Sequence, residues 1–391
     1  MKERTQVGII GAGPAGLLLS HLLAAAGIES VVLEVRSRQY AEGRVRAGVL
    51  EHGAAELLRA SGVGERMDRE GLVHRGINLQ FAGERHHVDF MELTGRTIVV
   101  YGQQEIVKDL ISARLRAGGR ILFEAEAKRL GGIVGDRPII TYRVGGEESE
   151  LGCDFVAACD GAHGIGRAAV PATVYERVYP HGWLGILART PPAERELIYA
   201  CHENGFALHS MRSPEVSRLY LQVAADEDLA NWPEARIWEQ LRLRLAEPDL
   251  RAGEILDLGI SALHSLVLEP MQHGRLYLAG DSAHIVPPTG AKGMNLALAD
   301  VQTLARALAV WYRSKSTTLL DGYTRSCLVR VWRAQQFSAF MTGLLHRTPA
   351  GDPFEHRLQL AQLSYLTRSR AASTSLAENY TSAATALDGG T

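Results

Sequence analysis

The chain has 391 residues, enough for two or three domains with a sizeable core. Hydrophobic residues make up 46% of it, charged residues make up 22%, and the formal net charge is -2. This balance is typical of a globular enzyme and argues against a protein that binds nucleic acid or an anionic membrane. No apolar run reaches the ~20 residues of a membrane span. The four cysteines form no CxxC pair, which predicts no metal site and is typical of a cytoplasmic protein.

The N-terminal segment has the pattern of a strand, a glycine-rich turn, a helix and a second strand. The strand "QVGII" runs into G-x-G-x-x-G at Gly11, Gly13 and Gly16, and the strand "ESVVLE" ends at Glu34. Gly11 permits the tight turn, Gly13 lets the backbone approach a pyrophosphate, and Gly16 lets helix and strand pack closely. The helix N-terminus favours phosphate, and Glu34 can accept hydrogen bonds from a ribose. The segment therefore predicts a dinucleotide site, with a glycine-rich turn of an unrelated α/β sheet as the alternative.

Two later stretches point to FAD. "CDFVAACDGAHGIGR" is a buried strand ending at Asp160, and "HGRLYLAGDSAHIVPPTGAKGMN" is another ending at Asp281. With the N-terminal segment they resemble the FAD-binding pattern of the flavoprotein aromatic hydroxylases. The resemblance implies that Asp281 hydrogen-bonds the ribityl chain and that residues 287–295 lie along the isoalloxazine ring. The alternative for Asp281 is an ordinary turn cap. The further FAD-binding residues that it implies are Ala15, Arg44, Arg46, Gln103, Asp160, Gly293, Met294 and Asn295.

The middle of the chain, from about Val174 to Ser265, changes to a period of two that predicts antiparallel strands. Ser210 and Arg212 alternate onto one face of a strand, and Tyr220 lies across the following hairpin. An arginine, a serine and a tyrosine on neighbouring strands make a carboxylate receptor. The alternative is a solvated sheet face.

The C-terminal stretches "LLDGYTRSCLVRVWRAQQFSAFMTGLLHR" and "EHRLQLAQLSYLTRSRAAS" are amphipathic. They predict helices that form a closing layer and a homodimer surface, with purely internal packing as an equal alternative. The predicted fold is α/β (α+β). It comprises a Rossmann-like FAD-binding domain at 1–174, completed by 270–300, an antiparallel-sheet substrate domain at 175–269, and the flavin-contacting loop and C-terminal helices at 270–391.

Further stretches resemble the family of 4-hydroxybenzoate 3-monooxygenases along nearly the whole chain: "GRVRAGVLE", "ERVYPHGWLGILA", "ELIYA", "GFALHSMRS" and "AENY". The resemblance implies a hydroxylase that uses FAD, NAD(P)H and O2 to convert 4-hydroxybenzoate into 3,4-dihydroxybenzoate through a flavin C4a-hydroperoxide. It implies that Ser210, Arg212 and Tyr220 hold the substrate carboxylate. The residues that it assigns to the phenol end are Tyr199 and the Pro288 carbonyl, with Tyr380 bonded to Tyr199 and His74 connecting the chain to solvent.

The sequence contains no second dinucleotide fingerprint that could bind the reductant, so we expect NAD(P)H to bind at a transient surface site. In the family, the segment after the second strand helps to distinguish NADPH from NADH. Here "EVRSRQYAEGR" offers Arg36, Arg38, Tyr40 and Arg44, and guanidinium groups bind a 2′-phosphate well. We expect NADPH to be preferred and NADH to be used as well, although Val35 replaces the common arginine. The family pattern assigns the shared pyrophosphate to His163 and Arg167.

Three departures from the family pattern, His181, Cys201 and His209, are expected beside the pocket. Salicylate, 3-hydroxybenzoate or 4-aminobenzoate are alternative substrates. Two other classes remain open at this point: a flavin dehydrogenase or oxidase that needs no NAD(P)H, and a non-catalytic protein that retains the FAD fold.

Overall fold

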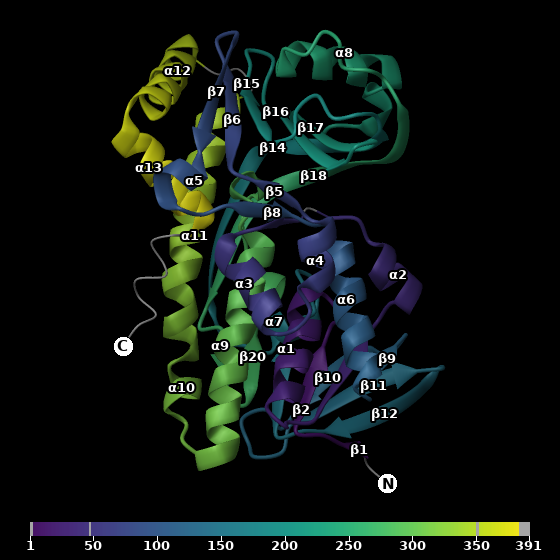
Figure 1. Ribbon diagram of the computed structural model, residues 1–391. Helices are drawn as coiled ribbons and strands as arrows, with labels where there is room; N and C mark the ends of the chain where they lie inside the picture. The colour runs from purple at the N-terminus through teal and green to yellow at the C-terminus, as the bar shows by residue number, and fades with distance from the viewer. Residues whose placement is uncertain (1–2, 47, 349–351, 383–391) are drawn as a thin grey trace.

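The computed structural model describes residues 3–46, 48–348 and 352–382. Figure 1 shows two lobes, with a parallel sheet in the lower lobe and a large antiparallel sheet in the upper one. Helices of the last third of the chain run along one side of both lobes. This arrangement confirms the predicted α/β fold with a Rossmann-like unit, an antiparallel sheet and C-terminal helices.

The lower lobe is built on a six-stranded sheet whose strand order is β19-β20-β13-β2-β3-β9. Its central strands are short and completely buried, as their runs of valine, isoleucine and alanine predict. Helix α1 (Pro14–Ala25) connects β2 to β3, and the two strands pair in parallel. The strands are β2 (Val7–Ile10), β3 (Ser30–Glu34), β9 (Arg120–Phe123), β13 (Phe155–Ala158), β19 (Gln272–His273) and β20 (Leu276–Leu278).

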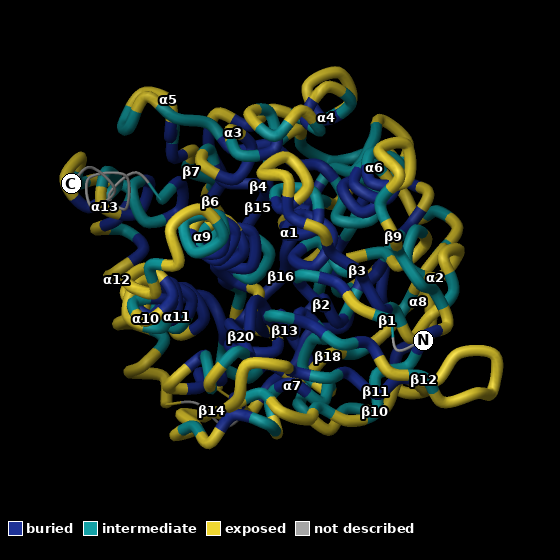
Figure 2. The backbone as a smooth tube through the Cα atoms, turned by 90° about the horizontal axis from the view of Figure 1, so that it is seen from below, coloured by how far each residue is buried: buried dark blue, intermediate teal, exposed yellow. Residues whose placement is uncertain are grey.

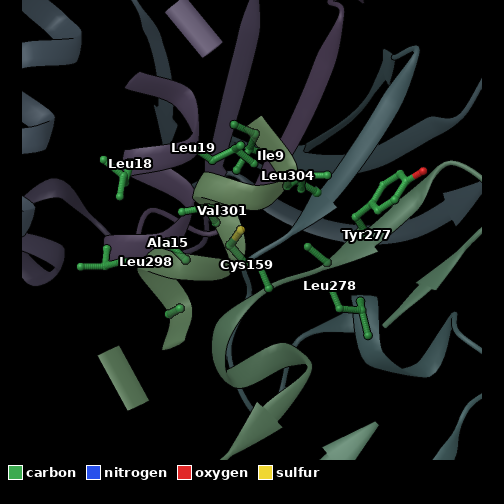
Figure 3. Packing of buried hydrophobic residues seen from close by; sticks show 14 of the residues in the cluster. Ile9, Ala15, Leu18, Leu19, Cys159, Tyr277, Leu278, Leu298, Val301 and Leu304 are labelled. Atoms are coloured by element: carbon green, nitrogen blue, oxygen red, sulfur yellow. The ribbon is translucent and has the colours of Figure 1, made fainter. Parts of the chain in front are cut away.

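The core of this lobe lies between the sheet, α1 and the long helix α9 (Gly293–Ser314). Figure 3 shows Leu298, Val301 and Leu304 of α9 near Leu19 of α1 and Ile9 of β2. All five side chains are fully buried, and each contributes roughly 1.5–3 kcal/mol of hydrophobic stabilisation relative to exposure. Because α9 begins at the proline-glycine loop, this packing sets the position of that loop.

Smaller elements surround the core. A four-stranded sheet contains β1 (Glu3–Arg4), β10 (Glu126–Gly131), β11 (Ile139–Val144) and β12 (Glu147–Gly152). A three-stranded sheet contains β4 (Val49–Leu50), β5 (Leu72–His74) and β8 (Ile98–Val100). The helices are α2 (Arg38–Gly43), α3 (His52–Ala60), α4 (Glu65–Glu70), α6 (Gln103–Arg116) and α7 (Ile165–Ala168).

The upper lobe is an eight-stranded sheet of order β21-β18-β14-β17-β16-β15-β6-β7. Helix α8 (Glu234–Leu245) covers one face, and the other face contributes to a separate core cluster with the C-terminal helices. The strands are β6 (Gly76–Phe81), β7 (Glu84–Asp89), β14 (Thr173–Arg189), β15 (Ile198–Cys201), β16 (Ala207–Ser213), β17 (Val216–Ala224), β18 (Glu254–Glu269) and β21 (His284–Ile285).

The substrate-domain boundaries predicted from the sequence need a correction. Strands β6 and β7 lie inside the segment 1–174, yet they complete the upper sheet, because β6 pairs in parallel with β15. Strand β21 joins the same sheet from beyond residue 269. Sequence periodicity could not reveal these pairings, since strand partners far apart in the chain are chosen by tertiary packing.

The remaining helices are α5 (Phe90–Thr94), α10 (Thr318–Asp321), α11 (Tyr323–Leu345), α12 (Pro353–Arg368) and α13 (Arg370–Thr381). Helix α11 spans both lobes, and its inner face is buried while its outer face is exposed, as Figure 2 shows. None of the described helices combines the length and the apolar character that crossing a bilayer requires.

Candidate active site

The glycine turn between β2 and α1 has the geometry of a phosphate cradle. Gly11 adopts φ +100°, and a Cβ there would lie 2.3 Å from the Cys159 carbonyl oxygen. A Cβ on Gly16 would lie 2.0 Å from the Gly11 carbonyl oxygen, whereas one on Gly13 would meet nothing within 4 Å. Gly13 is also the N-cap of α1, and no side chain caps the helix. The turn therefore leaves open space and free N–H groups where a pyrophosphate would lie, with Ala15 in the first turn.

Glu34, at the end of β3, lies beside this turn. Its Oε2 accepts a hydrogen bond of 2.7 Å from the Ala12 N–H, and its Oε1 accepts one of 2.8 Å from the Arg36 N–H. The carboxylate is thus held next to the glycine turn, where a ribose would follow a pyrophosphate.

Asp160 and Asp281 follow β13 and β20. Strand β13 is parallel to β2 and beside it, and β20 is parallel to β13 on its other side, so the carboxyl ends of these strands meet at the edge that carries the glycine turn. Asp160 Oδ2 accepts a hydrogen bond of 2.9 Å from the Gly166 N–H at the start of α7. Asp160 Oδ1 is buried and has no hydrogen-bond partner among the described residues. Burial raises the pKa of Asp160. Asp281 is exposed in a short 3-10 turn, η2 (Gly280–Ser282), and is available to a ligand.

Two arginines approach the Asp281 turn. Arg167 donates to the backbone carbonyls of Asp281 and Ser282 at 2.7 and 3.2 Å, so it shapes this turn as well as facing the edge of the sheet. Desolvation and the neighbouring Arg44 lower the pKa of Arg46, whereas Asp281 raises it. The structure therefore brings Arg44, Arg46, Asp281 and Arg167 close together, although they come from three distant segments.

The proline-glycine loop is joined to the residues after β4 by contacts that the sequence did not reveal. The Asn295 side chain accepts from the Glu51 N–H at 3.0 Å and donates to the Val49 and Ala291 carbonyls at 3.0 and 2.8 Å. Lys292 Nζ lies 2.6 Å from Glu51 Oε1, and both side chains are buried. Burial lowers the pKa of Lys292 and Glu51 opposes this shift. The Asn295 side chain is occupied, so a flavin contact there would use its backbone N–H.

A second unpredicted pair supports the Asp281 turn from beneath. Asp300 Oδ2, on α9, accepts a hydrogen bond of 3.1 Å from the Gly280 N–H and lies 2.7 Å from His284 Nε2. Both side chains are almost completely buried. The only signal in the sequence was the "GDSAH" stretch itself, because a contact over 16 residues leaves no periodic pattern.

These features fit the flavin part of the prediction. One edge of the parallel sheet is lined by the glycine turn, Glu34, the Asp281 turn and the loop 287–295, which Asn295 staples to Val49 and Glu51. A Cβ at either Gly11 or Gly16 would clash with backbone in the glycine turn. Gln103 opens α6, and Gly293 and Met294 open α9.

The residues expected to contact the reductant form two surface groups. Arg36 stacks over the Tyr40 ring at 5.2 Å, and Arg38 pairs with Glu42 at 2.7 Å on α2. His163 is exposed in the turn before α7. Helix α2 follows β3 and α7 follows β13, so the two groups lie on opposite sides of the β2 turn.

The carboxylate receptor has buried donors without partners. Ser210 Oγ, Arg212 Nε and Arg212 Nη1 are buried and make no hydrogen bond to any described residue. Leu208 pairs with Tyr220 across β16 and β17, so Ser210 shares the face of Tyr220. Arg212 lies at a β-bulge of β16, and its guanidinium lies beside the Tyr220 hydroxyl. Burial lowers the pKa of Arg212 and the Tyr220 hydroxyl opposes this shift. A buried guanidinium and hydroxyl without acceptors are costly unless an anion completes them.

Tyr199 lies in the same cross-strand row, because it pairs with Leu208 on its other side. Its hydroxyl shares a hydrogen bond of 2.6 Å with the Tyr380 hydroxyl from α13, and both rings are buried. Burial raises the pKa of both tyrosines, so both hydroxyls are neutral at physiological pH and each can donate. Pro288 is exposed at the start of η3 (Pro288–Gly290).

His74, which is predicted to connect the tyrosine pair to solvent, makes no hydrogen bond to either tyrosine among the described residues. It is buried on β5, and neither ring nitrogen has a hydrogen-bond partner among the described residues. Burial lowers its pKa to about 4, with Glu196 raising it and Arg212 lowering it. The imidazole is therefore neutral and lies within electrostatic reach of the carboxylate receptor.

The three departures from the family pattern differ in position. Cys201 shares the face of Tyr199 and is buried. His209 was expected beside the pocket, but it pairs with Ile198 in the row that faces α8, and its Nε2 accepts from the Ala193 N–H at 3.1 Å. Side chains of adjacent strand residues point to opposite faces, so His209 cannot share the face of Ser210.

His181 lies behind the pocket, in a stack of rings. Its imidazole stacks on His346 at 4.6 Å, and Trp183 Nε1 donates to His346 Nε2 at 2.6 Å. The Trp183 ring in turn lies 4.8 Å from the Tyr220 ring. His346 and Trp183 thus connect His181 to Tyr220.

The chain is similar to known FAD-binding proteins. The family model described as an FAD binding domain matches residues 4–338. The chain is 46% identical over 385 residues to the p-hydroxybenzoate hydroxylase of Acinetobacter baylyi, covering 96% of this chain and 95% of that protein. It is 25% identical to a 3-(3-hydroxy-phenyl)propionate/3-hydroxycinnamic acid hydroxylase of Burkholderia vietnamiensis, over 79% of this chain and 57% of that one.

The fold is shared with solved structures. The p-nitrophenol 4-monooxygenase of Pseudomonas putida superimposes with a TM-score of 0.85 at 18% identity, over 97% of this chain and 99% of that chain. An aklavinone-11 hydroxylase in complex with FAD and aklavinone gives 0.77 at 21% identity, over 88% and 70%. At such identities these structures establish the fold alone, whereas the sequence matches establish the family. The chain therefore belongs to the p-hydroxybenzoate hydroxylase family of FAD-binding proteins.

Proposed function

We propose that this protein is a monooxygenase that uses FAD, NADPH and O2 to hydroxylate 4-hydroxybenzoate at the 3-position, giving 3,4-dihydroxybenzoate. The observation that carries the proposal is that one face of the upper sheet holds two chemically different groups of side chains. Ser210 and Arg212 present buried donors without partners, and the Tyr199 and Tyr380 hydroxyls form a neutral pair. The name of the Acinetobacter baylyi relative supports the same substrate.

The first task of these residues is orientation. Arg212 can bind a carboxylate with two parallel hydrogen bonds, and Ser210 and Tyr220 can donate to the remaining lone pairs. Burial of the guanidinium strengthens this attraction, because little water competes for it. A substrate held by its carboxylate keeps its ring carbons in one place, which supplies the proximity contribution to the rate.

The second task is to make the ring electron-rich. A phenol has a reference pKa of about 10, and lowering it to about 7 needs roughly 4 kcal/mol at 1.36 kcal/mol per unit. The neutral Tyr199 hydroxyl can donate to a phenolate, and a hydrogen bond to the charged form lowers its pKa. Arg212 adds positive charge to the same site. We propose that Tyr380 then passes the proton on, since it shares a hydrogen bond with Tyr199.

Bound FAD supplies the activation of O2 that ring hydroxylation requires. On this chain, the residues that would hold FAD are the Gly11 to Gly16 turn, Glu34, Asp281 and the loop 287–295. The staple from Asn295 to Val49 and Glu51 keeps that loop against its neighbour. Such a rigid cradle helps to exclude water from the reacting ring.

Product analysis with four benzoates tests the proposal. Purified holoenzyme is supplied with NADPH and with 4-hydroxybenzoate, 3-hydroxybenzoate, salicylate or 4-aminobenzoate. We expect rapid NADPH oxidation and 3,4-dihydroxybenzoate only with the first compound. 3-Hydroxybenzoate and salicylate do not place a hydroxyl opposite the carboxylate, and 4-aminobenzoate has no phenol to ionise. Equal hydroxylation of salicylate would contradict the proposed substrate. NADPH-independent reduction of the flavin by an aromatic compound would instead indicate a dehydrogenase or oxidase.

We propose that α2 reads the 2′-phosphate of NADPH. Among the described residues, the exposed Arg38 side chain pairs with Glu42 alone, and such pairs contribute about 0–1 kcal/mol, so the guanidinium can turn to a phosphate. The Arg38→Glu variant should raise the KM for NADPH about tenfold, the effect of losing ~1.4 kcal/mol, and leave the KM for NADH nearly unchanged. Steady-state kinetics with both reductants measure this.

Two variants are useful comparisons. Arg69→Glu, on the exposed face of α4, should affect neither reductant. Arg167→Ala should impair both reductants alike and should also weaken FAD binding, because Arg167 holds the Asp281 and Ser282 carbonyls. Equal impairment of NADH and NADPH by Arg38→Glu would show that α2 does not read the phosphate.

We also propose a homodimer. Val329 and Trp332 of α11 and Phe354, Leu358 and Tyr365 of α12 are exposed apolar side chains on the C-terminal helices. Apolar side chains that form one exposed patch mark surfaces that bind another protein, and these five lie on two helices that contact each other. Sedimentation equilibrium that returns the mass of one chain at micromolar concentration would contradict this proposal.

A further inference from the structure

A cavity of about 330 Å³ opens between α3, α9, α11 and the end of α13, outside the carboxylate receptor. Its volume is at the lower end of the range for small-molecule sites. Leu57, Leu296 and Phe337 give it an apolar floor, and the basic side chains of Arg96, Arg330 and Arg333 also line it. Figure 1 shows these helices on the side of the molecule where both lobes meet α11.

The three guanidinium groups have only neutral partners among the described residues. Arg96 donates to the Ser382 carbonyl at 3.1 Å, Arg333 to Asn379 Oδ1 at 3.3 Å, and Arg330 to Thr303 Oγ1 at 2.9 Å. None of the ion pairs in the described part of the chain involves them.

The carboxylate of the lining does not compensate these charges. Glu51 pairs with Lys292, which also donates to the Asn379 and Tyr380 carbonyls. In addition, Arg330 Nε is buried and has no hydrogen-bond partner in the described ranges. Since a buried donor without an acceptor is costly, this atom points to a missing acceptor.

We propose that this cavity binds a small organic acid with one carboxylate and an apolar body. The carboxylate lies among Arg96, Arg330 and Arg333, because a guanidinium fork matches the two oxygens of a carboxylate. The apolar body covers Leu57, Leu296 and Phe337. Lys292 and Asn295 belong both to this lining and to the stapled loop 287–295, so the ligand touches a wall of the flavin cradle.

Calorimetric titration of the FAD-loaded protein with cyclohexanecarboxylate tests the proposal. 4-Hydroxybenzoate is omitted, because it is itself an acid with one carboxylate and an apolar ring and would compete for the cavity; titration of Arg212→Ala controls for binding at the carboxylate receptor. We expect one saturable site for the acid and none for cyclohexanecarboxamide, which has the same body without the charge. The Arg333→Gln variant should raise the Kd at least about fivefold, through loss of one charge-assisted contact.

A steric variant and a control make the result specific. Gly53 lines the cavity, and a Cβ there would meet nothing within 4 Å, so Gly53→Leu should fill the space and abolish binding without removing a charge. Arg325→Gln changes an exposed arginine of α11 outside the lining and should leave the Kd unchanged. The same titration on Arg212→Ala separates this site from the carboxylate receptor, and binding should persist there.

Four results would overturn the proposal. They are the absence of saturable binding at millimolar acid, equal binding of the amide, a Kd unaffected by both Arg333→Gln and Gly53→Leu, and loss of binding in Arg212→Ala with retention in Arg333→Gln. The last result would place the acid in the carboxylate receptor, whatever the natural substrate of that receptor is.

Discussion

The Arg212→Ala variant is expected to lose roughly 2–5 kcal/mol of affinity for 4-hydroxybenzoate, which is the cost of removing one partner from a buried, hydrogen-bonded charge pair. Two guanidinium nitrogens of Arg212 are buried and have no hydrogen-bond partner among the described residues, so they are available to an anion. The loss corresponds to about 30-fold to several thousand-fold in Kd at 1.4 kcal/mol per tenfold. Equilibrium titration of the flavin absorbance with substrate measures it.

The FAD content of this variant should stay unchanged, because Arg212 lies on β16 of the upper sheet, and the glycine turn lies in the lower lobe. Arg189→Ala provides a matched control, since Arg189 is an exposed arginine at the end of β14 that pairs with Glu254. Arg212→Lys should recover only part of the affinity, because an ammonium cannot form the bidentate fork. An Arg212→Ala variant whose Kd changes less than about threefold would exclude Arg212 from the carboxylate receptor.

The Tyr199→Phe variant should still oxidise NADPH in the presence of 4-hydroxybenzoate but should release mostly hydrogen peroxide in place of product. The variant leaves the carboxylate receptor intact and removes the hydroxyl that donates to the phenolate. Without it, much of the roughly 4 kcal/mol needed to ionise the phenol is lost, and ring attack slows by orders of magnitude at 1.36 kcal/mol per tenfold. The measurement is 3,4-dihydroxybenzoate formed per NADPH consumed.

Tyr380→Phe is the informative partner variant. It keeps the Tyr199 hydroxyl but removes its 2.6 Å hydrogen bond, so the proton transfer should slow while the direct contact to the substrate remains. We therefore expect weaker uncoupling than in Tyr199→Phe and a shift in the pH dependence of substrate ionisation, read from the phenolate absorbance. Unchanged coupling in Tyr199→Phe would falsify the role assigned to this hydroxyl.

The local elements of this protein follow from local sequence. The glycine turn is an example, because Gly11 and Gly16 sit where a Cβ would strike backbone 2.3 and 2.0 Å away, and only glycine allows that approach. The alternation of Leu208 and Ser210 likewise placed both on one face, because strand side chains alternate, whereas Arg212 lies at a β-bulge that alternation does not predict. The same rule, applied fully, would have placed His209 on the other face.

Only the tertiary structure decides which segments far apart in the chain come into contact. The sequence carries no signal that Asn295 staples Val49 and Glu51, that Asp300 supports Gly280 through a buried pair with His284, or that β6 completes the substrate sheet. Likewise, no pattern shows that Arg96, Arg330 and Arg333 line one cavity. The physical reason is that periodicity and turn chemistry report on neighbours along the chain. Polar pairs and cavities instead arise when packed elements bring together side chains that lie 16 to 246 residues apart in the chain, and each donor then bonds the acceptor that burial leaves within reach.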